Sequence, residues 1–490
     1  MSNSRAIRSK TISGALWKFG ERILAEVIHF VISVILARIL MPEDYGIIAL
    51  VTVFTVFCDK LIVCGFATSL IQKKDADDVD FSSVFYFSFA VAVILYIVLF
   101  FGAPLIANFY DKFDGETLIS VIRVSGLTLF LVAFNSVQHA YVSKHMLFKR
   151  NFWSVLGAIA ISGGIGISMA YGGFGVWALV AQNMVKTFIG MMILFLTVRW
   201  RPKWIFSLNR LKALFAYGWK IFVSSIIKVI YNDLRSLVIG KVFTPADLAF
   251  YNRGQTLPQL VDSNITGTID AVLFPAYSKL QDDKIALVGA MRRAVKTSCY
   301  ILMPALALMA AVSSPLVSVL LTDKWLPCVP FMQILCFSFM FSPIETENLQ
   351  SIKAIGRSDI VLKLEIAKRS IGVLLLICAV PIGLYAIAWS MLIGNVIAAL
   401  LNASPNRKLM GYPVYMQLYD VLPSLLMSIL VFCIPTLFIY VNPEMNKWWQ
   451  LIGGVGLGVL IYFISSWIFH VEAFTYIYSL LDKRSKRNEQ

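Results

Sequence analysis

Charged residues are scarce in this sequence. Asp, Glu, Lys and Arg together make up 14% of the 490 residues, whereas a soluble domain carries about 25%. Hydrophobic residues make up 58%, and the mean hydropathy is +0.76. A chain of this composition folded in water would have too little polar surface to cover its outside. The composition therefore excludes a water-soluble globular protein.

Cysteine frameworks are also absent. The seven cysteines form no CxxC pair and no cluster with histidine, so we expect no metal, disulfide framework or cofactor. No cleavable signal peptide is expected either. The first apolar stretch contains Lys18, Glu21, Arg22 and Glu26 and lacks a clear small-residue cleavage site. This stretch is predicted to remain as the first membrane helix.

Long apolar runs dominate the rest of the chain. Runs such as Leu418–Tyr440 and Leu451–Phe469 have about the 20 residues that a helix needs to cross the bilayer. The ten-residue alternating segments of a membrane β-barrel are missing. The pattern predicts an all-α integral membrane protein with about fourteen transmembrane helices, near residues 12–36, 46–71, 82–110, 117–142, 153–171, 174–198, 213–238, 248–278, 294–321, 329–352, 362–381, 384–402, 415–441 and 448–470.

Lys and Arg are distributed unevenly between the connections. One alternate set contains 26 of them, and the other contains only Arg38, Lys112, Lys241, Lys324 and Lys447. By the positive-inside rule, this asymmetry predicts a bacterial inner-membrane protein with both termini in the cytoplasm. The same rule accounts for the net charge of +15, so no nucleic-acid partner is expected. No connection is much longer than about a dozen residues, which leaves no room for a separate catalytic domain.

An internal repeat is visible at an offset of about 203 residues. The segment Arg38–Asp44 aligns with Lys241–Asp247, and the same offset places Asp59 on Asp262. Weaker matches follow in the same order, including Ala103–Ile106 with Ser314–Val317. The repeat predicts an N-terminal six-helix lobe at 1–200 and a second six-helix lobe at 201–410, with helices 13 and 14 and a basic tail at 411–490. Parallel repeats of this kind are a known transporter plan, with the substrate path between the halves.

The chain resembles Wzx-type flippases of the multidrug/oligosaccharidyl-lipid/polysaccharide exporter superfamily, more narrowly the branch linked to colanic and teichuronic acid export. The resemblance is carried by Ser13–Gly20, Leu36–Gly46, Gly65-Phe66, Ile71–Lys73 and Phe274–Leu280. It implies two six-helix lobes around a cationic cavity. It also implies alternating-access export of an undecaprenyl-diphosphate-linked repeat unit for surface polysaccharide biosynthesis. Membrane lipids, a polysaccharide polymerase and chain-length proteins are the further partners that it implies.

Two polar helix faces are candidates for binding the diphosphate. Lys18, Arg22, Glu26 and His29 share one face of the first helix, because their spacing is three or four residues. The seventh helix, its repeat partner, carries a matching series: Lys220, Ser224, Lys228, Tyr231 and Arg235. We predict that Lys18, Arg22, Lys220 and Lys228 face the cavity. The alternative is that the terminal members extend to the interface or form local ion pairs.

Further candidates lie on other helices. Gln255, Gln259 and Asp262 share one stripe of the eighth helix, and Arg123 lies on the fourth. A carboxylate within the membrane is costly, so Asp59 and Asp262 are candidate sites for a coupling ion or proton. The alternative is that each carboxylate is held in a structural ion pair.

Three other functions compete with this prediction. A drug or organic-cation exporter of the same superfamily would normally have twelve helices and an acidic, aromatic cavity, which fits this basic chain less well. A membrane-embedded enzyme of polyprenyl-sugar metabolism would need a nucleophile and base or an acid pair, and no such site is apparent. We therefore predict a transporter and no enzyme. A scaffold for polymer assembly is the third alternative.

Overall fold

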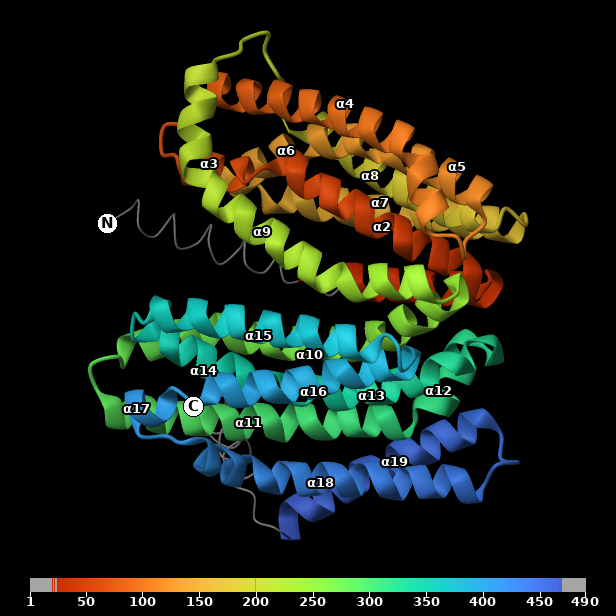
Figure 1. Ribbon diagram of the computed structural model, residues 1–490, viewed down its shortest axis with the longest axis vertical. Helices are drawn as coiled ribbons and strands as arrows, with labels where there is room; N and C mark the ends of the chain where they lie inside the picture. Colours follow the sequence, from red (N-terminus) through yellow and green to blue (C-terminus); the bar gives the residue numbers. More distant parts are fainter. Residues whose placement is uncertain (1–19, 21, 23, 199, 469–490) are drawn as a thin grey trace, which may run out of the picture. The chain divides into compact units, whose positions relative to one another are not determined.

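The structure is a computed structural model that describes residues 20, 22, 24–198 and 200–468 (Figure 1). This part of the chain is helical, without a β-strand. By their internal contacts the residues form two compact units, Met1–Ala249 and Phe250–Gln490, and the division falls inside one long helix, α10. The all-α fold predicted from the apolar runs is confirmed.

The first unit begins with a helical segment at residues 24–39. It continues with α2 (Pro42–Val63), α3 (Phe66–Gln72), α4 (Asp78–Phe109), α5 (Gly115–Gly126), α6 (Thr128–Lys144), α7 (Phe148–Tyr171), α8 (Val176–Thr197) and α9 (Leu208–Val242). Helix α10 (Pro245–Lys279) starts in this unit and continues into the second. In the second unit follow α11 (Lys284–Ala311), α12 (Ser313–Leu321), η1 (Asp323–Cys328), α13 (Val329–Phe339), α14 (Ser342–Ala354), α15 (Ser358–Ala379), α16 (Leu384–Ala403), α17 (Asn406–Met410), α18 (Val414–Val441) and α19 (Lys447–Ile468).

Eleven spans in the described part of the chain are long and apolar enough to cross a membrane. Several combine two or three helices that join with little interruption, such as α2 with α3 and α5 with α6. The segment at 24–39, α10 and α15 are three further long helical segments that do not qualify as spans. Together these elements are consistent with the predicted number of about fourteen.

Several helices start earlier than their apolar runs. Helix α11 begins at Lys284, ten residues before the predicted start at 294, and α9 begins at Leu208 rather than 213. In both cases a polar residue caps the helix: Asp283 accepts a hydrogen bond from the backbone N–H of Ala286, and Ser207 accepts one from Arg210. Capping side chains satisfy the free N–H groups of a first turn, so a helix can extend beyond its apolar run.

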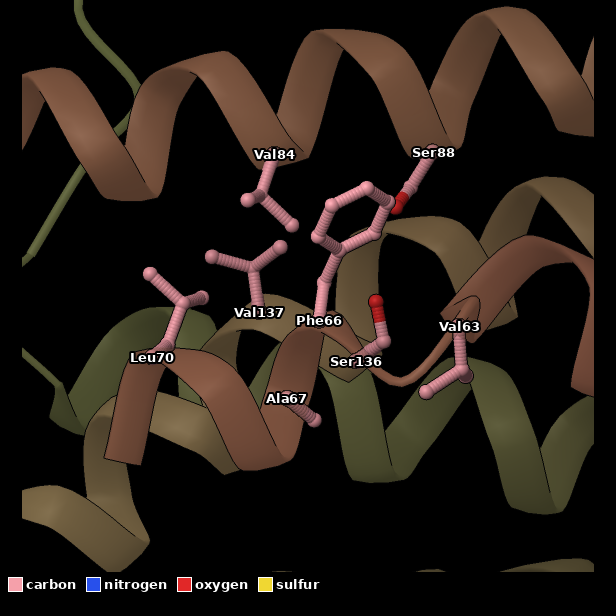
Figure 2. Close-up of a pocket in the computed structure, with 8 residues that line it drawn as sticks. All are labelled: Val63, Phe66, Ala67, Leu70, Val84, Ser88, Ser136 and Val137. Atoms are coloured by element: carbon pink, nitrogen blue, oxygen red, sulfur yellow. The ribbon is translucent and has the colours of Figure 1, made fainter. Parts of the chain in front are cut away.

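A local break separates α2 from α3. Cys64 and Gly65 both have positive φ, 45° and 72°, which is the left-handed backbone that favours glycine. A small apolar pocket lies beside the break, lined by residues of α2, α3, α4 and α6 (Figure 2). Its two polar members are already bonded to backbone: Ser88 Oγ donates to Ile62 O and Ser136 Oγ to Ala133 O. The pocket is therefore a packing gap at the helix break.

Helix α9 packs on the first unit. At one end, a Cβ placed on Gly65 would lie 2.4 Å from the carbonyl oxygen of Gly218, so only glycine allows this approach. At the other end, the Lys241 ammonium donates to Asp111, 3.0 Å away, and to the carbonyl oxygen of Phe109. By its contacts, α9 belongs to the first compact unit. The boundary predicted near residue 200 instead assigns α9 to the second lobe of the sequence repeat. That boundary concerns the duplication and stays a prediction.

In the second unit, a polar network fixes α18 against α11. Asp420 is buried and accepts bonds from the Arg292 guanidinium at 2.7 and 2.8 Å, from Tyr412 Oη at 2.7 Å, and lies 3.3 Å from Lys296 Nζ. A buried carboxylate is stable when it is paired and hydrogen-bonded in this way. Helix α19 packs on α18 and α12. The last two helices are thus integral parts of the second unit.

Candidate functional site

Helix α9 exposes most of its circumference. Only one narrow face is buried along its first half, formed by Leu211, Leu214 and Gly218 at helical spacing. The other residues of this half are exposed or half-buried. Such a helix can present two different surfaces, and its sequence gives them different chemistry.

The first of these surfaces is polar and cationic. Lys220, Ser224 and Lys228 are exposed and spaced four residues apart, and Tyr231 and Arg235 continue the same stripe in a half-buried position. Neither Lys220 nor Lys228 has a hydrogen-bond or ion-pair partner among the described residues. The Nε of Arg235 is buried and likewise makes no hydrogen bond within the described chain. Unsatisfied cations on one face make a site suited to an anion.

The second surface is apolar and lies beside the first on the same helix. Trp219, Val223, Ile227 and Ile230 are between 42% and 50% exposed, at spacings of three and four residues. Lys228 directly follows Ile227, and Lys220 directly follows Trp219, so the cations border the apolar stripe. An amphiphile with an anionic head and a hydrocarbon tail could contact both surfaces at once.

The cationic face predicted for the first helix contains an ion pair, unlike the face of α9 in the described part of the chain. Arg22 is exposed but lies 3.2 Å from the carboxylate of Glu26, one turn later. This local pair neutralises part of the predicted positive face and is the arrangement named as its alternative. His29 is also exposed. Lys18 lies outside the described residues, so its predicted role stays a prediction.

In the second unit, the α10 stripe is partly accessible. Gln259 is exposed, and Gln255 and Asp262 are half-buried. The hydroxyl of Ser342 donates a hydrogen bond to Asp262. The predicted role of Asp262 as a coupling-ion or proton site stays a prediction.

Asp59, the repeat counterpart of Asp262, lies on α2 in the first unit. It is half-buried, and its Oδ1 is enclosed and makes no hydrogen bond with the described part of the chain. An enclosed carboxylate oxygen without a donor is costly. This environment is compatible with an ion or proton site at Asp59, and that role stays a prediction.

Arg123 has a structural partner. Its Nε donates to the carbonyl oxygen of Phe100 at 3.2 Å, and its guanidinium lies over the Phe100 ring, 4.3 Å from the centroid. Gln333 and Ala310 lie 210 positions after Arg123 and Phe100, respectively, and form the equivalent bond: Gln333 donates to the carbonyl oxygen of Ala310 at 3.3 Å. The equivalence supports the duplication. It also favours a packing role for Arg123 over the predicted substrate contact, which stays untested.

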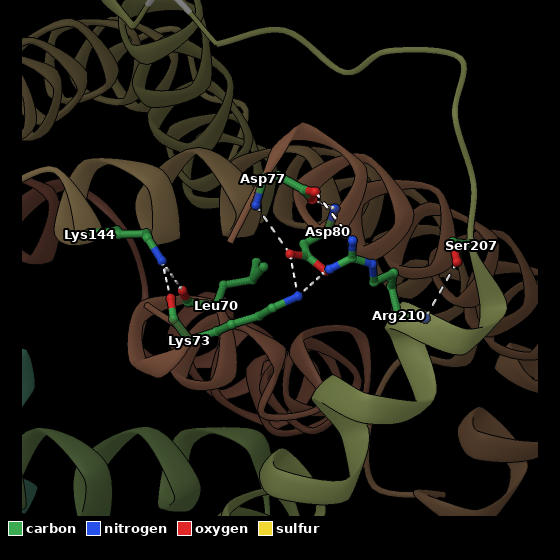
Figure 3. Close-up of polar contacts among 7 residues, drawn as sticks. All are labelled: Leu70, Lys73, Asp77, Asp80, Lys144, Ser207 and Arg210. Carbon is green, nitrogen blue, oxygen red and sulfur yellow. Dashed lines mark hydrogen bonds and ion pairs between the residues drawn. The ribbon is translucent and has the colours of Figure 1, made fainter. Parts of the chain in front are cut away.

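A charged cluster that was not predicted from the sequence holds the start of α9 (Figure 3). Asp80 is buried and accepts two bonds from Lys73 Nζ, at 2.6 and 2.7 Å. The guanidinium of Arg210 on α9 lies 3.6 Å from Asp77 and 3.9 Å from Asp80. The available signal was the spacing of Asp77 and Asp80, a capping pair that opens α4. Its partner on α9 is too distant in sequence to infer.

A second charged cluster, whose pairing was not predicted from the sequence, lies in the second unit. Lys368 Nζ on α15 donates to Glu345 on α14 at 2.6 Å and to Glu365 at 2.8 Å, and Arg369 lies 3.4 Å from Glu365. The 3- and 4-residue spacings within α15 were visible in the sequence. The link to Glu345 spans 23 positions and depends on how the two helices pack.

Comparison with known proteins agrees with this architecture. A teichuronic acid biosynthesis protein of Bacillus subtilis, TuaB, is 23% identical over 437 residues, 87% of each chain. The lipopolysaccharide biosynthesis protein WzxC of Escherichia coli is 23% identical over 372 residues, 74% of each chain. An uncharacterised membrane protein in the cps region of Klebsiella pneumoniae is 24% identical over 82% of each chain.

Solved structures with the same fold include the lipid II flippase MurJ in an inward closed conformation. Its TM-score is 0.73 at 16% identity, with 94% of this chain and 99% of that chain covered. An inward-facing multidrug transporter of the MATE family and MOP superfamily has a TM-score of 0.59 at 16% identity, covering 82% of this chain and 94% of that chain. These structural similarities show the fold, and the sequence similarity to TuaB and WzxC confirms the predicted resemblance. Residues 35–330, more than half of the chain, match the family described as polysaccharide biosynthesis proteins, and the chain belongs to this family.

Proposed function

We propose that this protein moves an undecaprenyl-diphosphate-linked oligosaccharide from the cytoplasmic to the outer leaflet of the bacterial inner membrane. The single observation that carries the proposal is the pair of stripes on α9. Lys220 and Lys228 offer unpaired positive charge to a diphosphate, and Trp219 and Ile227 offer an apolar surface to the polyprenyl tail. The names of TuaB and WzxC support a role in the synthesis of surface polysaccharides.

The energetic need for such a site is large. One charged side chain at the centre of a bilayer costs about 2.5–3.5 kcal/mol on insertion scales, and a diphosphate carrying sugars costs more. Cations that are already inside the membrane region compensate part of this cost. In the proposed mechanism the head group crosses between the two duplicated halves by alternating access, and the tail stays in lipid. The protein then acts as a transporter with no covalent chemistry, and both of its termini lie in the cytoplasm.

A test in cells separates this proposal from its main competitor. Deleting the gene should abolish the surface polysaccharide and cause lipid-linked repeat units to accumulate in the inner leaflet. Complementation with the wild-type gene should restore both, and complementation with the Lys220→Ala, Lys228→Ala double variant should not. Intact polysaccharide together with increased sensitivity to cationic dyes would instead identify a drug exporter.

A further inference from the structure

Residues 200–207, which precede α9, are non-helical and lie along the side of α4. The backbone N–H of Lys203 donates to Ser82 Oγ at 3.0 Å, and that of Ser207 donates to Ser83 Oγ at 2.9 Å. Between them, the Trp204 ring stacks on Tyr86 with a centroid distance of 5.7 Å and an interplanar angle of 26°. The segment 200–207 therefore follows the first turns of α4.

The side chains at the middle of this segment are apolar and exposed. Trp204 is 95% exposed, Ile205 43% and Phe206 49%. Three consecutive large apolar side chains with this exposure would be unfavourable in water. Trp200, at the beginning of the same segment, is buried between Phe81 and Tyr141. Trp200 therefore packs inside the first unit, whereas Trp204, Ile205 and Phe206 are exposed on its surface.

The contact between Trp204 and Tyr86 indicates how deep Trp204 lies in the membrane. Tyr86 follows Asp78, the first residue of α4, by eight positions, which is about 12 Å along the helix axis. The polar layer on each side of a bilayer is about 5–7 Å thick. With α4 along the membrane normal, Asp78 at the outer edge of this layer places Tyr86 about 5–7 Å inside the hydrocarbon, and Asp78 about 5–7 Å further out, in water, places Tyr86 and the stacked Trp204 ring at the hydrocarbon boundary.

Non-helical backbone at this depth needs internal hydrogen-bond partners, because lipid supplies none. Ser82 and Ser83 supply two of them. The two basic residues of the segment also have partners. Lys203 Nζ lies 2.5 Å from Asp78, and the Arg201 guanidinium donates to the carbonyl oxygens of Val198 and Trp200. The bonded N–H groups of Lys203, Ile205 and Ser207 and the exposed apolar side chains together fit a lipid environment.

We propose that Trp204, Ile205 and Phe206 insert into the acyl and headgroup boundary of one leaflet and anchor the start of α9 to membrane phospholipid. In the orientation predicted by the positive-inside rule, this is the inner leaflet. Tryptophan is enriched at this boundary, where its apolar ring and polar N–H are both accommodated. The anchor connects the two sequence halves and holds the end of the helix that carries Lys220 and Lys228.

Site-directed spin labelling tests the proposal on the full chain in phosphatidylcholine nanodiscs. A Trp204→Cys variant, in a background whose seven native cysteines are replaced, carries a nitroxide whose collisions with oxygen and with a water-soluble nickel chelate are compared. Lys74→Cys, in the exposed loop before α4, is the reference for water. Phe101→Cys, 72% exposed on the same helix, is the reference for lipid.

The label at position 204 should have an oxygen-to-nickel collision ratio several-fold higher than the label at position 74 and close to that at position 101. Ile205→Cys provides the same reading at a position that does not stack on Tyr86, in case the Trp204 variant does not fold. Ratios at positions 204 and 205 that match position 74 would overturn the proposal. They would place the apolar group in water, as a surface for a protein partner.

Discussion

Asp44 and Asp247 lie 203 positions apart and make the same hydrogen bond. Asp44 Oδ2 accepts from the backbone N–H of Met41 at 3.1 Å, and Asp247 Oδ2 accepts from the backbone N–H of Thr244 at 3.1 Å. Each carboxylate is the third residue of a helix that starts with proline, α2 or α10. The repeat found in the sequence therefore reappears as the same helix start in both halves of the chain.

Removing either carboxylate should destabilise the protein. A side-chain acceptor for a free N–H at a helix start contributes about 1 kcal/mol, so Asp44→Ala and Asp247→Ala should each lower the thermal unfolding midpoint measured in detergent. Asp75→Ala, in the exposed loop before α4, serves as a control and should leave the midpoint unchanged. Equal midpoints for all three variants would show that the two caps do not contribute.

The close approach of α2 and the start of α10 should not tolerate a side chain. A Cβ on Gly46 would lie 2.0 Å from the carbonyl oxygen of Pro245, which forces the two backbones apart. Gly46→Ala should therefore cost about 1–3 kcal/mol, seen as a lower unfolding midpoint. Gly102→Ala, at a half-buried position of α4 where an added Cβ meets nothing within 4 Å, should be neutral or slightly stabilising. A neutral Gly46→Ala would contradict this packing.

The buried carboxylate at the start of α4 should matter more than its exposed neighbour. Asp80→Asn keeps the shape but removes the charge that Lys73 contacts, and should cost about 2 kcal/mol in unfolding free energy. Asp78→Asn breaks a pair in which both side chains are about half exposed, and should cost less than about 1 kcal/mol. The two variants can be compared by thermal unfolding in the same detergent. A larger effect for Asp78→Asn would reverse this assignment.

Stability should depend on pH through Asp77. Its pKa is lowered by the hydrogen bond from the backbone N–H of Asp80 and by the nearby Arg210 guanidinium. A lowered folded-state pKa stabilises the protein above the unfolded value of about 3.9, and this contribution is lost as the pH falls through the folded pKa. The unfolding midpoint of the wild type should thus fall more steeply below pH 4 than that of Asp77→Asn. Parallel pH profiles would exclude a contribution from Asp77.

Much of the fold could be predicted because hydrocarbon imposes simple rules on a sequence. Apolar runs of about 20 residues predict helices, and the aligned Asp44 and Asp247 predict the duplication. The packing of α9 on the first unit was not predictable. It depends on the contact between Gly65 and Gly218 and on the proximity of Arg210 to Asp80, and helical periodicity carries no information about such distant partners.

The candidate site could be predicted only in part, because helical spacing shows which residues share a face and not which residues they contact. Spacing alone places Lys220 and Lys228 on one face of α9, and the structure leaves both exposed. Spacing also places Arg22 and Glu26 together, but it does not decide whether they face a cavity or pair with each other, as they do here. The bond between Arg123 and Phe100 depends on packing between α4 and α5, and nothing local signals it.

Binding of undecaprenyl diphosphate by the purified protein tests the central claim most directly. A charge-assisted contact is worth about 1.5–3 kcal/mol, so Lys220→Ala and Lys228→Ala should each raise the Kd about tenfold or more. Lys212→Ala removes an exposed lysine of the same helix that lies off the polar stripe, and it should leave the Kd unchanged. Unchanged binding by the Lys220 and Lys228 variants, or an equal loss with Lys212→Ala, would contradict the account.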